Sequence, residues 1–85
     1  MTEFDILKWF AQYLFENVGI RRDLVIPTAD IVLDLGLDSF DSVLLVMEAE
    51  EKFYVNIPSS RAEEIRTIGD AIKIILEIGR DSSSP

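Results

Sequence analysis

Residues 34–53 read DLGLDSFDSVLLVMEAEEKF, in which a short apolar loop leads into a segment with a helical pattern. Asp38 or Ser39 is suited to cap a helix that begins here, and Asp41 suits its first turn. Neither Gly nor Pro interrupts the stretch from Ser39 to Phe53. The sequence therefore predicts a helix from about Ser39 to Phe53.

The predicted helix carries more apolar residues than one face requires. One stripe consists of Leu45, Val46, Ala49 and Phe53. A second stripe, rotated away from the first, consists of Phe40, Val43, Leu44 and Met47. A four-helix bundle would bury both stripes, whereas an exposed second stripe would contact a partner.

An amphipathic helix is predicted on the N-terminal side. Thr2 and Asp5 form a helix-start signal, and Gly19 stands where the helix should end. The predicted apolar stripe consists of Phe4, Leu7, Ala11, Leu14 and Val18, with Phe10 and Phe15 beside it. We expect Trp9 and Tyr13 to lie at the edge of the core.

Residues 19–38 show no clear periodicity. Pro27 and Gly36 interrupt them, and scattered aliphatic residues predict a long loop that is held against the core. The run Ile31-Val32-Leu33 has the composition of a strand but no obvious partner. Loops of this length in small domains often have a function.

The C-terminal part predicts a short helix and a long one. Pro58 ends an extended piece, after which Ser59 or Ser60 would cap a helical turn that reaches Ile65. Thr67 and Asp70 repeat the start signal for a last helix, with apolar positions at Ile68, Ala71, Ile72, Ile75, Leu76 and Ile78. The fold class is all-α: a small four-helix bundle, with three main helices, one short helix and a long first loop. We expect one domain over residues 1–78 and a disordered tail over residues 79–85.

Composition excludes several functions. The 85 residues contain 8 Lys and Arg against 16 Asp and Glu, a net charge of −8, and no Cys or His. Thiol and histidine catalysis are excluded, no metal site is expected, and nucleic acid and anionic membranes would be repelled. No segment is long and apolar enough for membrane insertion. The acidic start lacks the basic residue of a signal peptide, so we expect a cytoplasmic monomer.

Several motifs in order resemble the acyl carrier protein family. They are Asp34-Leu35-Gly36-Leu37, Asp38-Ser39-Phe40, Ile57-Pro58 and Thr67-Ile68-Gly69-Asp70-Ala71-Ile72. The similarity covers residues 4–78 at the family's spacing. A lone Asp-Ser dipeptide would indicate only a helix cap, whereas the set of motifs favours a carrier site at Ser39. Ser42 is a weaker alternative because it lacks the preceding Leu-Gly-Leu-Asp.

The resemblance implies a non-catalytic carrier. In the family, a separate phosphopantetheinyl transferase attaches 4′-phosphopantetheine to the motif serine, and the thiol of this arm holds acyl groups. The position of Ser39 implies that it is the attachment site, and the position of Asp38 implies that it steers the transferase or its metal. The expected function is to hold acyl intermediates for fatty-acid, lipid or polyketide-type biosynthesis.

The acids around Ser39 predict partners with basic docking surfaces. They are Asp34, Asp38, Asp41, Glu48, Glu50 and Glu51, and they form either a merely solvated face or a docking surface for the Lys and Arg of acyl-loading and acyl-transferring enzymes. The predicted docking residues are Phe40, Asp41, Val43, Leu44, Met47, Glu48 and Glu51. The family commonly has Leu in place of Phe40 and Glu in place of Leu44. These departures favour a specialised carrier that serves a dedicated pathway.

Two alternatives to an acyl carrier stay open. A carrier of aminoacyl or peptidyl groups would have the same arm, although Leu37-Asp38 fits that class less well. A helical interaction module would keep the fold without the modification. An enzyme is the least favoured class, because catalysis would have to depend on carboxylates alone.

Overall fold

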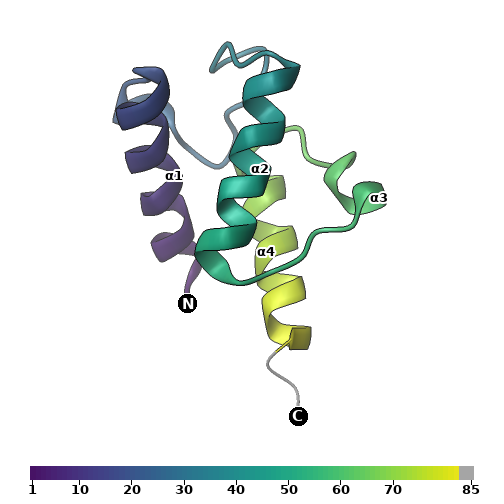
Figure 1. The fold of residues 1–85 in the computed structure, drawn as a ribbon. Helices are drawn as coiled ribbons and strands as arrows, with labels where there is room; N and C mark the ends of the chain where they lie inside the picture. Colours follow the sequence, from purple (N-terminus) through teal and green to yellow (C-terminus); the bar gives the residue numbers. More distant parts are fainter. Residues whose placement is uncertain (83–85) are drawn as a thin grey trace.

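The computed structural model describes residues 1–82 and consists of helices joined by loops (Figure 1). Its elements are α1 (Glu3–Val18), the 3₁₀ helix η1 (Arg22–Leu24), α2 (Ser39–Phe53), α3 (Ser59–Ala62) and α4 (Ile68–Ser82). Residues 1–82 contain no strand. The predicted all-α fold with three main helices, one short helix and a long first loop is confirmed, as are the predicted bounds of α2.

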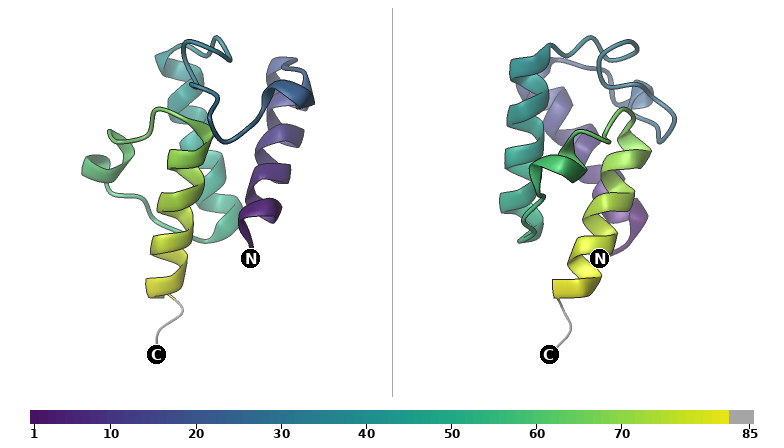
Figure 2. Two further views of the ribbon diagram at one scale, coloured as in Figure 1. Left: turned by 180° about the vertical axis from the view of Figure 1, so that it is seen from behind. Right: turned by 90° about the vertical axis from the view of Figure 1, so that its right-hand side faces the viewer.

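The three long helices form the body of the bundle, and α3 stands to one side of it (Figure 2). Helix α1 runs antiparallel to α2 and α4, and the long first loop crosses one end of the bundle (Figure 1). This arrangement leaves one side of α2 facing α3 and the loop. None of the helices within residues 1–82 is long and apolar enough to cross a membrane.

The two predicted start signals form reciprocal caps. At α1 the Thr2 hydroxyl accepts a bond from the Asp5 backbone N–H (3.2 Å), and the Asp5 carboxylate accepts one from the Thr2 N–H (3.0 Å). Thr67 and Asp70 make the same pair of bonds at the start of α4, both at 3.1 Å. The backbone N–H groups at each cap lower the pKa of Asp5 and of Asp70 below the ordinary aspartate value. Gly19 ends α1 with a φ of 77°, in the left-handed region that favours glycine.

The predicted apolar stripe of α1 is partly wrong. Phe4 is 68% exposed, and Phe15 and Val18 are also exposed. The buried row is the predicted Leu14 and Phe10 together with Ile6, which the prediction missed, and Leu7 and Ala11 are partly buried beside it. Phe4 and Ile6 are two residues apart and so point to nearly opposite sides of the helix, and the remainder of the bundle covers only the side of Ile6.

Trp9 and Tyr13 lie at the edge of the core, as predicted. The Trp9 ring stacks on that of Tyr13, with 5.1 Å between centroids. It also meets the Phe53 ring edge-on at 5.5 Å, which joins α1 to α2. These aromatic contacts orient the two helices against each other.

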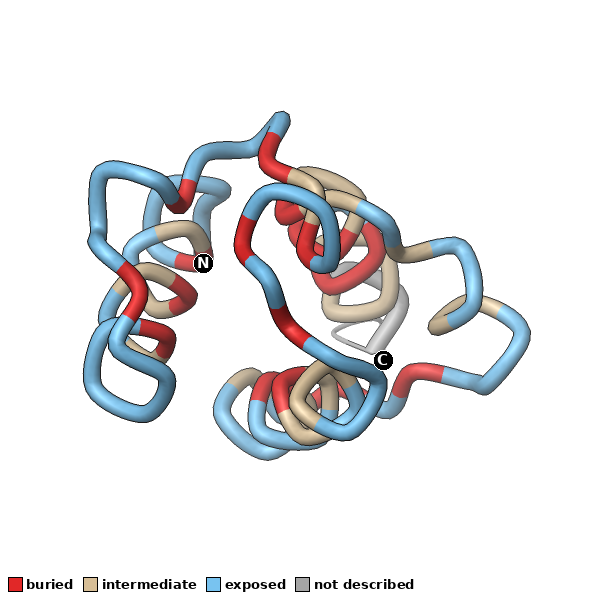
Figure 3. The backbone as a smooth tube through the Cα atoms, turned by 90° about the horizontal axis from the view of Figure 1, so that it is seen from above, coloured by how far each residue is buried: buried red, intermediate tan, exposed pale blue. Residues whose placement is uncertain are grey.

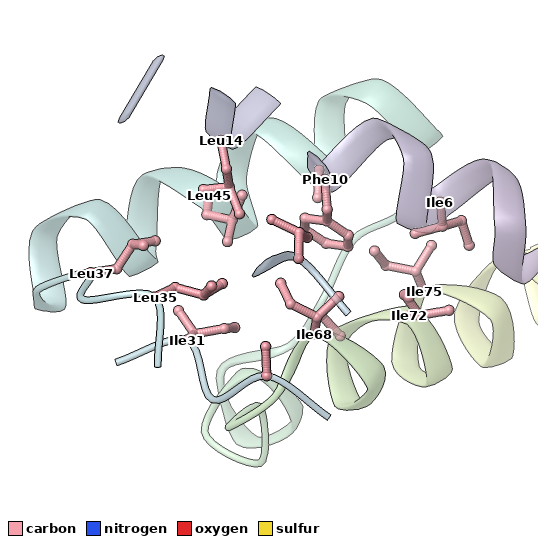
Figure 4. Close-up of a cluster of buried hydrophobic side chains, with 14 of the residues drawn as sticks. Ile6, Phe10, Leu14, Ile31, Leu35, Leu37, Leu45, Ile68, Ile72 and Ile75 are labelled. Atoms are coloured by element: carbon pink, nitrogen blue, oxygen red, sulfur yellow. The ribbon is translucent and has the colours of Figure 1, made fainter. Parts of the chain in front are cut away.

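The core collects side chains from all three long helices and from the first loop (Figures 3 and 4). Helix α2 contributes Leu45 and Ala49, and α4 contributes Ile68, Ala71, Ile72, Ile74 and Ile75. From the loop, Val25, Ala29, Ile31, Leu35 and Leu37 are buried. The prediction of a long loop held against the core is therefore confirmed.

The first loop is also hydrogen-bonded to the start of α4. The Ile31 N–H donates to the Arg66 carbonyl (2.9 Å), and the Ile68 N–H donates to the Ala29 carbonyl (3.1 Å). Asp30 and Thr67 thereby form an isolated antiparallel bridge. The strand-like run at residues 31–33 forms a turn rather than a strand, and the bridge beside it places the segment that leads to α2 against α4.

Gly69 permits the closest approach between the loop and α4. Its N–H donates to the Pro27 carbonyl at 2.8 Å, and a β-carbon at Gly69 would lie 2.8 Å from the same oxygen. We expect Gly69→Ala to destabilise the fold by about 1–3 kcal/mol, because a backbone atom must shift. The gain in helix propensity, up to about 1 kcal/mol, offsets only part of this cost.

Urea denaturation would measure this effect, with Gly79→Ala as the matched control in the same helix. A β-carbon at Gly79 would meet the flexible end of the Met1 side chain at 3.1 Å and, at an ordinary contact distance of 3.8 Å, a methyl group of Val55. The control should be neutral or slightly stabilising. Equal effects of the two substitutions would contradict the role assigned to Gly69.

The C-terminal elements differ from the prediction in three details. Pro58, not Ser59 or Ser60, holds the cap position of α3, because Ser59 is already the first helical residue. Helix α3 ends at Ala62 rather than near Ile65. Helix α4 continues to Ser82, past the predicted domain end at residue 78, because added residues extend an existing helix at little cost. Residues 83–85 of the predicted tail lie outside the described residues.

Candidate functional site

Ser39 is the first residue of α2, and its side chain is exposed. The cap is Asp38, whose carboxylate accepts a hydrogen bond from the Asp41 N–H at 2.8 Å. The Ser39 hydroxyl makes no hydrogen bond to any group within residues 1–82. Asp38 therefore fulfils the capping role, and the Ser39 hydroxyl is available for another one.

Ser42, the alternative site, differs from Ser39 in its exposure and its hydrogen bonding. It lies one turn further along α2 and is half-buried. Its hydroxyl donates to the Asp38 carbonyl at 2.8 Å. Of the two serines, only Ser39 presents an exposed and uncommitted hydroxyl.

The loop that precedes Ser39 is locally ordered. The Asp34 carboxylate accepts the Asp30 N–H at 2.7 Å, and the Asp30 carboxylate accepts the N–H groups of Val32 and Leu33. Gly36 turns the chain with a φ of 75°. Leu35 and Leu37 on either side of it are buried. These contacts hold Ser39 at a defined position at the end of the bundle.

A cavity of about 750 Å³ opens beside Ser39, between the first loop, α2 and α3. Its apolar lining consists of Ile31, Val32, Leu33, Val43, Val46, Met47, Ala62 and Ile65. Ser39 and Ser42 also line it, together with Asp30, Ser59, Glu63 and Arg66. The space therefore combines an apolar wall with the serine hydroxyl at the start of α2.

No motif in the sequence indicated that several of these residues would line a cavity. Ile31 lies far along the chain from Ala62 and Ile65, and no motif links them. Val46, which we assigned to the core stripe, is partly buried and also lines the cavity. Only the tertiary structure brings these side chains from the first loop, α2 and residues 62–65 around one space.

The second apolar stripe of α2 faces outward. Phe40 is 69% exposed, Val43 57% and Met47 55%, while Leu44 is half-buried. The other stripe enters the core through Leu45 and Ala49, with Val46 and Phe53 partly buried. Of the two outcomes that the sequence left open, the structure has the exposed second stripe.

The acids around Ser39 divide into two groups. Asp34, Asp38 and Glu50 accept backbone N–H groups, and Glu50 does so from Ile57 at 2.8 Å. The carboxylates of the other three accept no hydrogen bond and form no ion pair within residues 1–82; they are Asp41, Glu48 and Glu51. The first group shapes the fold, and the second leaves uncompensated negative charge along α2.

The charge along α2 reaches α1. Burial raises the pKa of the Tyr13 hydroxyl above its ordinary value, and the negative charges of Glu48 and Asp41 raise it further. Tyr13 thus lies beside the edge of α2 that carries these acids. The negative charge of the chain therefore acts at this particular place, between α1 and α2, as well as in the net charge of the whole chain.

Added salt should therefore raise the melting temperature. The chain has a net charge of −8, and ions screen repulsion beyond about 10 Å at 0.1 M ionic strength. Thermal melts in NaCl and in MgCl₂ would measure the effect, which should be larger for the divalent cation. Glu48→Gln should reduce the salt response, because it removes one of the unpaired charges. A melting temperature that stays flat or falls with salt would contradict this prediction.

Comparisons with known proteins agree with the geometry. Residues 9–75 match the family model described as a phosphopantetheine attachment site. An acyl carrier protein of Cyanidioschyzon merolae is 44% identical over 77 residues, which cover 91% of this chain and 85% of that protein. The solved structure of the acyl carrier protein from Enterococcus faecalis has a TM-score of 0.75 at 32% identity, and the match covers 92% of this chain and 99% of that one. The chain belongs to the acyl carrier protein family, whose model is that of a phosphopantetheine attachment site.

Proposed function

We propose that this protein carries acyl groups as thioesters on a 4′-phosphopantetheine arm attached to Ser39. Membership of the family supports a carrier role, and the choice of residue depends on local geometry. The observation that carries the proposal is the exposed, uncommitted hydroxyl of Ser39 at an apolar cavity. The pathway we propose is a dedicated one, in fatty-acid, lipid or polyketide-type biosynthesis.

The residues present fit the prosthetic group. A phosphodiester at Ser39 needs a hydroxyl that an enzyme can reach and an environment that tolerates negative charge. Ser39 meets the first requirement, and its place in the first turn of α2 puts it at the positive end of the helix dipole. When bound, the arm would supply a thiol, which this chain lacks because it has no Cys.

The lining of the cavity is an argument for an apolar cargo. Its aliphatic walls from α2, α3 and the loop would shield a hydrocarbon chain from water, at about 25 cal/mol for each Å² buried. The lining also contains the charged residues Asp30, Glu63 and Arg66. An aminoacyl or peptidyl cargo would bring polar groups against the aliphatic wall, so this wall favours an acyl group over that alternative.

The exposed face of α2 is our proposed docking surface for partner enzymes. It combines apolar Phe40, Val43, Leu44 and Met47 with the unpaired acids Asp41, Glu48 and Glu51. A partner that presents Lys and Arg around an apolar patch would match both features. The phosphopantetheinyl transferase and the acyl-loading and acyl-transferring enzymes are the partners we propose for it, with Asp38 beside the modified serine.

Enzymatic labelling tests the proposed function. The full chain would be incubated with a broad-specificity phosphopantetheinyl transferase and coenzyme A, and its mass measured. We expect the mass to rise by one prosthetic group, and digestion should locate the group on the peptide that contains Ser39. An unchanged mass under conditions that label a known carrier would favour the unmodified helical module instead.

A further inference from the structure

The segment of residues 58–65, which Arg66 follows, forms one wall of the cavity. Ser59, Ala62, Glu63, Ile65 and Arg66 all line it. Helix α3 within this segment contains no buried residue, and only Ala62 and Ile65 pack partly against the core. Figure 2 shows α3 displaced from the three long helices. A segment with so few buried apolar contacts is expected to open at low cost in free energy.

Both ends of this wall are anchored. Before it, Ile57 is buried and its N–H donates to the Glu50 carboxylate at 2.8 Å. After it, the Arg66 carbonyl accepts the Ile31 N–H, and buried Ile68 begins α4. The wall can therefore move only as a flap between two fixed ends.

One polar contact ties the flap to the bundle. The Arg61 guanidinium donates from Nη2 to Oε2 of Glu77 on α4, at 2.7 Å. Among the described residues, no other hydrogen bond or ion pair joins residues 58–65 to the rest of the molecule. The second partner of Arg61, Glu64 at 3.4 Å, lies within the flap itself. The bond to Glu77 also raises the pKa of Arg61 above the ordinary arginine value.

We propose that the Arg61–Glu77 ion pair is a latch that holds the flap against α4 and so limits the size of cargo that the cavity admits. The link to cargo rests on the function proposed above, whereas the latch itself does not. Because the contact is half-exposed rather than buried, it can break and reform without stranding a charge in the core. The cavity then has a closed and an open state, and the ion pair sets their ratio.

Amide hydrogen exchange on the unmodified full chain tests the latch. In Glu77→Gln we expect exchange at Ala62, Glu63 and Ile65, whose N–H groups are bonded within the flap, to rise about fivefold, near the upper range for a partly exposed ion pair. Glu64→Gln is the matched control, since it removes a partner of Arg61 but leaves the bond to α4. It should leave these rates unchanged.

A double-mutant cycle completes the exchange experiment. If Arg61 and Glu77 act through each other, Arg61→Gln combined with Glu77→Gln should open the flap no further than either change alone. Additive effects would overturn the latch, as would equal effects of Glu64→Gln and Glu77→Gln. A rise in exchange along all four helices would also overturn it, because Glu77 would then stabilise the whole bundle.

Binding of an apolar dye tests the consequence for the cavity. N-phenyl-1-naphthylamine would be titrated into the unmodified protein and into Glu77→Gln. If the dye enters the open state, its Kd should fall by up to about fivefold, in proportion to the population of that state. An unchanged Kd would overturn the proposal that the ion pair controls access to the cavity. Failure to label Ser39 would remove the proposed carrier function but leave both of these results standing, so the two failures are distinguishable.

Discussion

Replacing Ser39 by alanine is expected to abolish attachment of the prosthetic group and to leave the fold intact. The attachment needs the hydroxyl oxygen, and no other group at this position replaces it. The fold should be nearly unaffected because Asp38, not Ser39, caps α2, and because Ser39 is exposed. Exposed substitutions of this kind usually change stability by no more than about 0.5 kcal/mol. Intact mass after incubation with the transferase and coenzyme A measures the modification.

Ser42→Ala is the matched control for this experiment. It removes a serine hydroxyl from the same helix, one turn away, and should still accept the group. Its stability should fall by no more than about 1 kcal/mol, through loss of the bond from its hydroxyl to the Asp38 carbonyl. Labelling of Ser39→Ala, or its loss in a folded Ser42→Ala, would assign the site to Ser42.

The second large effect is expected at Leu45. Its side chain is 1% exposed within the core, so Leu45→Glu would bury a charge with no partner. We expect a loss of about 4 kcal/mol or more. At about 4–8 °C for each kcal/mol in a domain of this size, the melting temperature should fall by at least about 15 °C. Thermal melts followed by circular dichroism would measure it.

The neighbouring change, Leu44→Glu, should behave very differently. Leu44 is half-buried on the outward stripe, so its new charge would stay in water. Repulsion from Asp41 and Glu48, three and four residues away on the same face, should cost only about 0.2–0.5 kcal/mol each. A fall in melting temperature as large as that of Leu45→Glu would assign Leu44 to the core and remove it from the proposed docking surface.

The two predictions concern different aspects of one helix. Ser39 is exposed and Leu44 half-buried, whereas Leu45 is buried and holds the same helix in the bundle. A carrier must satisfy both demands, because an arm on a loosely held helix would not be presented at a defined position. The buried row of α2 must therefore hold the helix in place if the exposed side is to have the function that we propose for it.

Much of the helical structure could be predicted because its causes are local. The bounds of α2, Ser39 to Phe53, follow from a cap within three residues and the absence of Gly and Pro. The Thr2–Asp5 and Thr67–Asp70 caps likewise depend on bonds between residues three apart. Such bonds form within a few residues of chain, so the sequence alone contains all the partners.

Which apolar residues are buried was harder to predict from the sequence. In α1 the sequence favoured a stripe through Phe4, but the structure buries Ile6 and exposes Phe4. In α2 the sequence offered two stripes and did not choose between them. Both helices are rich in apolar residues on several sides, and the choice depends on which side the other helices cover.

By itself, the sequence determined the helices, their caps, the excess of negative charge and the motif that singles out Ser39. Only the tertiary structure decided which face of α2 is exposed, formed the cavity beside Ser39, and placed Arg61 against Glu77 across sixteen residues. It also brought Gly69 against Pro27. The physical reason is that hydrogen bonds along a helix join near neighbours, whereas burial, cavities and contacts between segments exist only once distant parts of the chain have packed together.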